Sequence, residues 1–391
     1  MELFKLTDAQ QAIVAKIDRM AQERFAPRAA KYDAEAVMPV DDLKDLHAEG
    51  MLLACADRKW GGLGYGVHQD DPMCFFLSIE RIARVNPGTA HDFQVHNNCV
   101  QMICDLARDD MIPKFLEPTR VRGKVIPGAG SEPAMTAYST QGGQGGGGLS
   151  STAKKVDGGY RVNGIKHYAT NASYAEWLWV GLLLEGTRSD ITLMIPADAP
   201  GVTIDASVWD PIGMRACVSP VIKFEDVFVP EEYVLGEPGM LMNGTWLGKI
   251  NLGFTATYLG AMQGIFDYLV PYVRDKGRSK DPFRQVQVGE MKIRIDAVRL
   301  LMYTAISNFQ ADPDGAMLMA NEAKWMAVES VQRFMYLVGQ AGGPSVMFKN
   351  RPVERLIRDL HLHVLHGRQH MMAMCVGQAA LGEPYNLNLS V

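Results

Sequence analysis

The spacing of apolar residues changes twice along the chain, and these changes constrain the fold more than any single motif. From Leu6 to about residue 120, apolar residues recur every three or four positions, which is the spacing of amphipathic helices. Around Arg122, short β-branched and aromatic runs separated by turn residues begin, and this texture is typical of strands. After Gly236 the helical spacing returns and persists nearly to the end.

This order predicts an α+β fold with three domains. We expect an N-terminal α-helical domain over 1–121, a middle antiparallel β-barrel or sandwich domain over 122–237, and a C-terminal four-helix bundle domain over 238–391.

Three local signals add detail to this plan. Thr7 followed by Gln10 resembles a capping box at the start of a helix, and the glycines of RKWGGLGYG predict a turn between helices. The stretch QGGQGGGG at 141–148 predicts a mobile flap or linker, because glycine loses the most backbone entropy when it is ordered. A phosphate-binding loop is not expected there, since no Gly-Lys-Ser/Thr follows.

Composition excludes several classes of protein. The 391 residues carry a formal net charge of −5, so the chain offers no basic stripe for nucleic acid. It has no run of about 18 apolar residues and no leader pattern, so we expect no membrane partner and a cytoplasmic location. The six cysteines form no Cys-x-x-Cys pair, which favours reduced thiols in the core.

Five ordered motifs resemble the acyl-CoA dehydrogenase superfamily over nearly the whole chain. They are WGGLGYG (60–66), GSEPAM (130–135), NGIKHYATNA (163–172), FEDVFVPEEYVLG (224–236), and QAGGPS (340–345) followed by PVERLIRD (352–359). The resemblance implies an acyl-CoA dehydrogenase-like fold. It also implies a flavoprotein, usually a homotetramer, whose flavin ring lies between the β domain and the C-terminal helices.

The resemblance also implies a set of flavin-binding residues. Backbone groups of two loops would hydrogen-bond the edge of the ring, Tyr168 would stack beside it, and Thr170 would place a hydroxyl near flavin N5. Arg274 or Arg278 would reach a flavin phosphate, although a solvated charged face is an equal alternative. The expected cofactor-binding residues are Gly130, Ser131, Tyr168, Ala169, Thr170, Arg278, Gln340, Gly342 and Gly343.

A dehydrogenase of this superfamily needs a carboxylate base over the α-carbon of its thioester substrate. The family keeps this glutamate in one of two places, and neither Leu360–Gly382 nor Pro238–Phe266 contains an aspartate or glutamate here. Histidine takes its place in RDLHLHVLHGRQH, where His366 follows Asp359 by seven residues.

This histidine pattern and DPFRQVQVGEM (281–291) resemble the oxygen-using branch of the superfamily, the two-component flavin-dependent monooxygenases of the dibenzothiophene monooxygenase and 4-hydroxyphenylacetate hydroxylase type. That branch takes reduced flavin, FMN or FAD, from a separate flavin reductase. It forms a C4a-hydroperoxyflavin with O2 and oxygenates a small organic substrate.

Histidine suits this chemistry because a neutral imidazole both donates and accepts a proton, with an ordinary pKa of about 6.5. We expect His366 to steady the hydroperoxide and His96 to activate substrate or oxygen. Asn97, beside His96, and Met371 are expected to contact the substrate.

Other interpretations of these residues stay open. Asp359, His363, His366 and His370 share one helix face and would suit a metal, but no metal site is expected. His361 and His363 are expected to be polar residues on the helix surface, His96 has an equal alternative as a core histidine, and the methionines would fill the core.

Two other functions compete with oxygenation. The first is an acyl-CoA dehydrogenase with a non-standard catalytic base, oxidising an acyl thioester between Cα and Cβ. The second is a non-catalytic protein that keeps flavin only as a scaffold.

Overall fold

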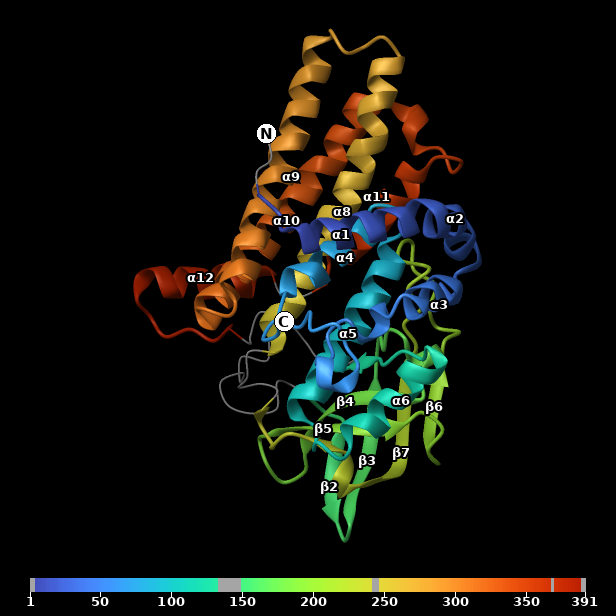
Figure 1. Ribbon diagram of the computed structural model, residues 1–391, viewed down its shortest axis with the longest axis vertical. Coiled ribbons are helices and arrows are strands. Elements are labelled where there is room, and N and C mark those ends of the chain that lie inside the picture. Colours follow the sequence, from blue (N-terminus) through green and yellow to red (C-terminus); the bar gives the residue numbers. More distant parts are fainter. Residues whose placement is uncertain (1–3, 133–148, 241–245, 367–368, 388–391) are drawn as a thin grey trace.

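The computed structural model describes residues 4–132, 149–240, 246–366 and 369–387, and it has three parts (Figure 1). Helices of the N-terminal part cross the middle of the molecule, a β-sheet lies at one end, and a bundle of long C-terminal helices extends to the other. Residues 133–135 of GSEPAM and the glycine-rich stretch 141–148 lie outside the described residues.

The N-terminal part is helical, as the spacing predicts. Its α-helices are α1 (Asp8–Met20), α2 (Ala26–Glu35), α3 (Val40–Ala48), α4 (Pro72–Ala83), α5 (Pro87–Leu106) and α6 (Ile112–Arg122). The capping box at Thr7 and Gln10 is confirmed, with both reciprocal hydrogen bonds formed. In the glycine turn, a Cβ on Gly62 would meet the carbonyl oxygen of Ala56, so only glycine fits there.

The middle part is one mixed sheet of β1 (Gly128–Ala129), β2 (Thr152–Val156), β3 (Gly159–Lys166), β4 (Trp177–Leu184), β5 (Asp190–Pro196), β6 (Val202–Asp205), β7 (Val221–Pro230) and β8 (Val234–Leu235). Their order is β6-β7-β3-β2-β4-β5-β8, with β1 beside β4. The expectation of a purely antiparallel domain needs correction, because β1 and β2 pair with β4 in parallel.

The connection from β3 to β4 explains the parallel pairing. Residues 167–176 join β3 to β4, and β4 runs first beside β1 and then, at its last two residues, beside the start of β2 rather than beside β3. Since β2 and β3 are antiparallel, a strand that runs against β3 runs parallel to β2. This connection also carries Tyr168, Ala169 and Thr170 at one end of the sheet.

The C-terminal part consists of α8 (Trp246–Asp275), α9 (Pro282–Asn308), α10 (Pro313–Gly342), α11 (Pro352–His363) and α12 (Gln369–Leu381). The long helices α8, α9 and α10 run side by side, α11 packs beside α8, and α12 projects from one side (Figure 1). Within the described residues, no helix is both long and apolar enough to cross a membrane.

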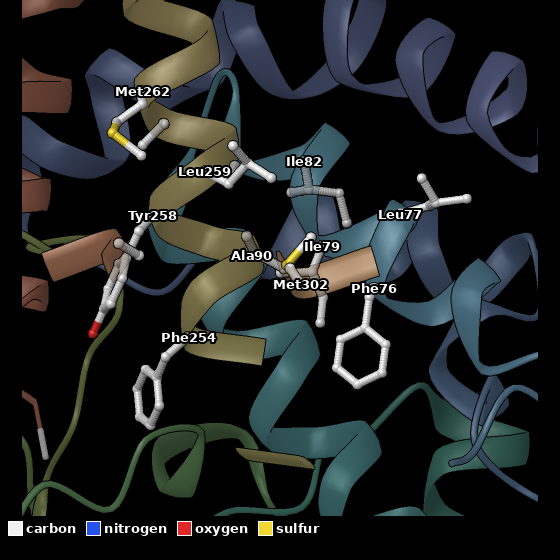
Figure 2. Close-up of a cluster of buried hydrophobic side chains, with 14 of the residues drawn as sticks. Phe76, Leu77, Ile79, Ile82, Ala90, Phe254, Tyr258, Leu259, Met262 and Met302 are labelled. Carbon is white, nitrogen blue, oxygen red and sulfur yellow. The ribbon is translucent and has the colours of Figure 1, made fainter. Parts of the chain in front are cut away.

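The N-terminal and C-terminal helices share one apolar core. Side chains from α4, α5, α8 and α9 meet there, and Figure 2 shows Phe76, Leu259 and Met302 among them. Inside this contact, Glu80 of α4 is fully buried and accepts hydrogen bonds from Arg299 and Tyr303 of α9. The charge of Arg299 and the hydrogen bond from the Tyr303 hydroxyl lower the pKa of Glu80 to about 2, although burial alone would raise it.

Helices α4 and α8 approach closely because two glycines on one face of α8 leave room for the backbone of α4. A Cβ on Gly260 would lie 2.2 Å from the carbonyl oxygen of Glu80, and a Cβ on Gly264 would lie 2.0 Å from that of Arg84. Replacement of either residue must therefore push the two helices apart.

We predict that Gly264→Ala lowers the free energy of unfolding by about 1–3 kcal/mol, because the added methyl overlaps the Arg84 carbonyl. The matched control is Gly289→Ala on α9, where nothing lies within 4 Å of the new Cβ. There the higher helix propensity of alanine should stabilise by up to about 1 kcal/mol. Urea unfolding measures both, and equal effects would contradict the close approach.

Candidate functional site

Helix α11 carries the C-terminal histidines, and polar contacts with two other parts of the chain hold it in place. The backbone N–H of Met214 donates to Asp359 Oδ1 at 2.6 Å, and Arg358 pairs with Asp33 at 2.7 Å. A Cβ on Gly213 would lie 2.0 Å from the Arg358 carbonyl oxygen, so the β-domain segment lies directly against the helix. These contacts turn His363, one turn after Asp359, towards α5 and α8.

Three histidine rings from α5 and the end of α11 converge and form what we call the histidine cluster: His91, His363 and His366. The ring centroids of His91 and His363 are 4.6 Å apart, and that of His366 lies 5.2 Å from His363 and 5.8 Å from His91. Phe254 of α8 stacks on both His91 and His366 at 5.4 Å. Phe254 and Tyr258 project from the same side of α8 (Figure 2).

Burial keeps the cluster neutral at physiological pH. It lowers the pKa of His91 to about 3 and that of His366 to about 4, and the pKa of His363 lies well below its ordinary value. The positive charge of Lys324 on α10 adds to the effect on His363 and His366.

Lys324 is itself fully buried. Its ammonium donates to Asn251 Oδ1 at 2.9 Å and lies 4.4 Å from the centre of the Phe254 ring. Burial lowers its pKa from 10.5 to about 7. The site thus combines neutral imidazoles with a lysine that titrates near neutral pH.

His363 has an unusual feature for a buried residue. It is 1% exposed, and neither ring nitrogen has a hydrogen-bond partner among the described residues. A buried polar group without a partner costs about 1–3 kcal/mol. The expectation that His363 is a polar surface residue is therefore wrong, and its free nitrogens mark a place where a polar ligand would be held.

Two loops at the end of the sheet lie next to each other. The His167 backbone N–H donates to the Ser131 carbonyl at 3.0 Å, and the Lys166 ammonium pairs with Glu132 with both side chains fully buried. Glu132 also accepts from Ser150 and Ser151, the residues that precede β2. The predicted flavin loops are therefore together in space.

The second loop presents the side chains expected around a flat ring. Tyr168 has a φ of 57° in the left-handed region, which is uncommon for a non-glycine residue, and it is 62% exposed. Thr170 is buried, with its hydroxyl 2.8 Å from that of Ser219. The Asn171 side-chain N–H donates to the carbonyl of Asp92 at 2.9 Å, which ties this loop to α5 beside His91.

These observations fit a flavin. A Cβ on Gly130 would meet nothing within 4 Å, Tyr168 offers an exposed aromatic face, and the free nitrogens of His363 lie at the end of α11. The loops offer backbone groups for the polar edge of the ring, and the helices offer aromatic and imidazole side chains.

The geometry does not support the expected role of His96. Its Nε2–H donates to the Leu52 carbonyl at 2.7 Å, its Nδ1 accepts from the Ile126 N–H at 2.9 Å, and the side chain is fully buried. Both ring nitrogens are therefore used by the backbone. The alternative of a core histidine, which the sequence left open, is the better description.

Asn97 is also a structural residue. Its Oδ1 accepts from the Cys55 N–H, and its Nδ2 donates to the carbonyls of Met51 and Phe93, all within the buried N-terminal part. The geometry therefore does not support its expected contact with a substrate. Met371 lies in the first turn of α12 and is partly exposed.

The remaining predicted flavin residues lie elsewhere. Arg278 is exposed in the turn after α8, and Gln340, Gly342 and Gly343 lie at the end of α10. Gly342 packs against Leu269 near the outer end of α8, so this group sits at the outer end of the bundle. A pocket of about 200 Å³ in the same region has Arg274 and Arg284 in its lining.

Sequence reasoning missed His91, and the spacing on α5 explains why. His91 and His96 stand in the same motif but five residues apart, which is about 1.4 helical turns, so they point in different directions. The motif contains two histidines, and only the packing of α5 shows that His91, and not His96, faces α11.

The titratable side chains of the described residues form no candidate metal site. Within the described ranges, no three His, Cys, Asp or Glu side chains have the geometry to hold a metal ion. The six cysteines are unpaired, and five of them are buried, in line with the predicted core thiols.

Comparison with known proteins places the chain in a family. Models of the acyl-CoA dehydrogenase N-terminal, middle and C-terminal domains match residues 7–120, 128–227 and 245–381. The mitochondrial isovaleryl-CoA dehydrogenase of Oryza sativa subsp. japonica is 28% identical, over 96% of this chain and 92% of that protein. The mitochondrial 2-methylacyl-CoA dehydrogenase of Solanum tuberosum is 27% identical, over 95% and 90%.

Solved structures of dehydrogenases and of a monooxygenase share the fold. Butyryl-CoA dehydrogenase from Megasphaera elsdenii superposes with a TM-score of 0.87 at 24% identity, covering 97% of this chain and 99% of that one. TdsC from Paenibacillus sp. A11-2 with FMN and indole, a dibenzothiophene monooxygenase, gives 0.84 at 20% identity, covering 98% and 100%. Because the three domain models follow one another over nearly the whole chain, the protein belongs to the acyl-CoA dehydrogenase family.

Proposed function

We propose that the protein is a flavin-dependent monooxygenase that uses reduced flavin and O2 to oxygenate a small organic substrate. Its family makes it a flavin-dependent oxidoreductase. The observation that carries the finer proposal is the neutral histidine cluster, which stands beside the flavin loops. A fold shared with a monooxygenase as well as with dehydrogenases is compatible with it.

The family's carboxylate base has no counterpart in the two segments where it is expected. The described parts of these segments contribute Asn251, Phe254, His363 and His366 to the cluster region instead. Neutral imidazole and amide groups bind and orient polar oxygen atoms, and imidazoles with a pKa of about 3 or 4 are weak bases for an α-proton.

The residues of the cluster have separate tasks in this proposal. When bound, reduced flavin activates O2 and supplies one oxygen atom. His366 would donate a hydrogen bond to that oxygen, and His91 would orient the substrate or oxygen from the α5 side. Burial, together with the positive charge of Lys324, keeps the His366 imidazole neutral and therefore able to donate one hydrogen bond and accept another.

We assign flavin binding to two groups of residues, one on the two loops and one at the outer end of the C-terminal bundle. Gly130, Ser131, Ala169 and Thr170 would bind the ring edge, and Tyr168 would stack beside it. Because Arg278, Gln340, Gly342 and Gly343 lie at the outer end of the bundle, we propose that they bind the flavin of a second copy in a homotetramer. Reduced FMN or FAD would come from a separate flavin reductase.

An acyl-CoA dehydrogenase with a non-standard base is the second candidate, and its support is that the curated relatives are dehydrogenases.

We predict that the purified protein holds little flavin and consumes oxygen only when reduced flavin is supplied. Flavin content, oxygen uptake and an anaerobic titration with acyl thioesters measure this. Tightly bound yellow flavin that bleaches with a thioester would establish the dehydrogenase, and a flavin that reacts in neither assay would indicate a scaffold.

We predict that His366→Ala uncouples oxygen use from product formation by about tenfold or more, because the hydrogen-bond donor to the oxygen is lost. Hydrogen peroxide release and product yield per O2 measure the coupling. His361→Ala is the matched control, since His361 lies on the same helix but is exposed. Unchanged coupling in His366→Ala would remove the role assigned to this residue.

The pH profile should show the depressed pKa values of the cluster. We predict that coupling stays level as pH falls through 6.5, where an ordinary histidine would gain a proton, and is lost only towards pH 4, where His366 becomes charged. In Lys324→Met, the positive field is absent, so this loss should move to higher pH. A midpoint near 6.5 in the unsubstituted protein would contradict the neutral cluster.

A further inference from the structure

Three lysine side chains of the described residues are buried, and one of them differs from the other two. Lys166, Lys249 and Lys324 are each at most 1% exposed. The Lys166 ammonium pairs with Glu132. Burial lowers the pKa of Lys249, and the nearby carboxylate of Asp105 acts against this effect. Among the described residues, no carboxylate lies within ion-pair distance of Lys324, and burial alone lowers its pKa, so this ammonium is a buried cation without a counter-charge.

The hydrogen bonds of Lys324 are also incomplete. An ammonium group carries three N–H donors. One of them donates to Asn251 Oδ1 at 2.9 Å, and this is its only hydrogen bond within the described part of the chain. The face of the Phe254 ring, 4.4 Å from the nitrogen, attracts the cation but carries no net charge to balance it. Two N–H donors and one positive charge are therefore left for a ligand.

His363 gives a second and independent indication of a ligand at this place. It is 1% exposed, and both of its ring nitrogens lack a hydrogen-bond partner among the described residues. In a neutral imidazole, one of these nitrogens is a donor and the other is an acceptor. The ring centroids of His363 and Phe254 are 5.3 Å apart, so His363 and Lys324 contact the same aromatic side chain. The unused polar groups of both residues therefore lie around Phe254.

The charge of this region limits the class of ligand. Burial keeps His91, His363 and His366 neutral, so the only charge on these three residues and Lys324 is that of the ammonium. A carboxylate supplies one negative charge and about four lone-pair sites, enough to accept from the ammonium and from a ring N–H. A phosphate ester carries nearly two negative charges and would leave one of them unbalanced. A neutral ligand would leave the buried ammonium unbalanced, which is costly.

We propose that the substrate is an organic monocarboxylic acid whose carboxylate pairs with Lys324 and accepts a hydrogen bond from His363. This inference rests on the proposed function, because that function makes the histidine cluster the substrate site. Phe254 also stacks on His91 and His366 at 5.4 Å, so an acid held by Lys324 lies beside the residues assigned to substrate and oxygen. Lys324 thus selects the substrate by its charge.

The preference for an acid is tested by calorimetry on the purified full-length protein at pH 6, where Lys324 is mostly charged. The probes are three pairs: benzoate and benzamide, 2-naphthoate and 2-naphthamide, and hexanoate and hexanamide. The members of a pair have nearly the same size and differ in charge. We expect at least one acid to bind about tenfold or more tightly than its amide. No preference for the acid in any pair would overturn the proposal.

Substitution tests whether Lys324 causes this preference. Lys324→Met removes the charge and keeps an unbranched side chain, so affinity for the preferred acid should fall about thirtyfold or more, with little change for the amide. Lys249→Met is the matched control, because Lys249 is equally buried but has Asp105 nearby. Thermal melting identifies the variants that fold. A preference that survives in Lys324→Met, or that is lost equally in folded Lys249→Met, would overturn the role of Lys324.

Proton uptake measures the same contact without any substitution. Burial lowers the pKa of Lys324 to about 7, and a bound carboxylate would raise it again by favouring the charged form. Binding of the acid should therefore take up about half a proton at pH 7 and almost none at pH 5.5. His363 and His366 have lower pKa values, and Asn251 does not titrate. Calorimetry in two buffers of different ionisation enthalpy measures the uptake, and an acid that binds at pH 7 without it would contradict the pairing.

Turnover with reduced flavin and O2 separates this inference from the proposed function. Lys324→Met should raise the KM for the preferred acid by about thirtyfold, with a smaller change in kcat, because the lost contact is to the carboxylate and not to the reacting atoms. If the acid binds through Lys324 but reduced flavin and O2 give no product, the proposed function fails and the acid site stands. If the protein oxygenates a neutral compound and prefers no acid, the proposed function stands and this inference fails.

Discussion

The docking of α11 against the β domain and α2 determines where the site forms. Asp359 accepts the Met214 N–H, and Arg358 reaches Asp33, so one helix turn contacts residues from all three parts of the chain. Gly213 permits this contact because any side chain there would overlap the helix backbone. From this anchor the next turn of α11 carries His363 to His91. If α11 were rotated by one residue, a different side chain would face α5, and the histidine cluster would not form.

Desolvation then decides the chemical state of the titratable groups in this region. The same burial that disfavours the positive form of His91, His363 and His366 also disfavours the negative form of Asp92, and it raises the pKa of that carboxyl. Burial also lowers the pKa of Lys324 from 10.5 to about 7, so this group titrates near neutral pH. The interior between α5, α8, α10 and α11 is therefore a low-charge environment, which suits hydrogen-bond donation and proton transfer better than ionic catalysis.

Much of the architecture could be predicted from the sequence because it depends on local patterns. The change from helical to strand spacing placed the sheet between two helical parts, and the capping box and glycine turn depend on neighbouring residues. The two loops expected to bind flavin stand close to β1 and β3 in the sequence, and the structure brings them together. The parallel pairing of β4 with β1 and β2 could not be predicted, because it depends on where the 167–176 connection places β4 in the sheet.

The candidate site could be predicted less completely than the fold, because it depends less on local sequence patterns. The sequence by itself determined that the two segments expected to hold a carboxylate base have none, and that histidine stands near the end of α11. Only the tertiary structure decided that His91 rather than His96 joins His366, and that the buried His363 ring has no hydrogen-bond partner among the described residues. The physical reason is that helix spacing fixes which residues share a face, whereas burial, pKa and available partners are set by side chains that come from distant parts of the chain.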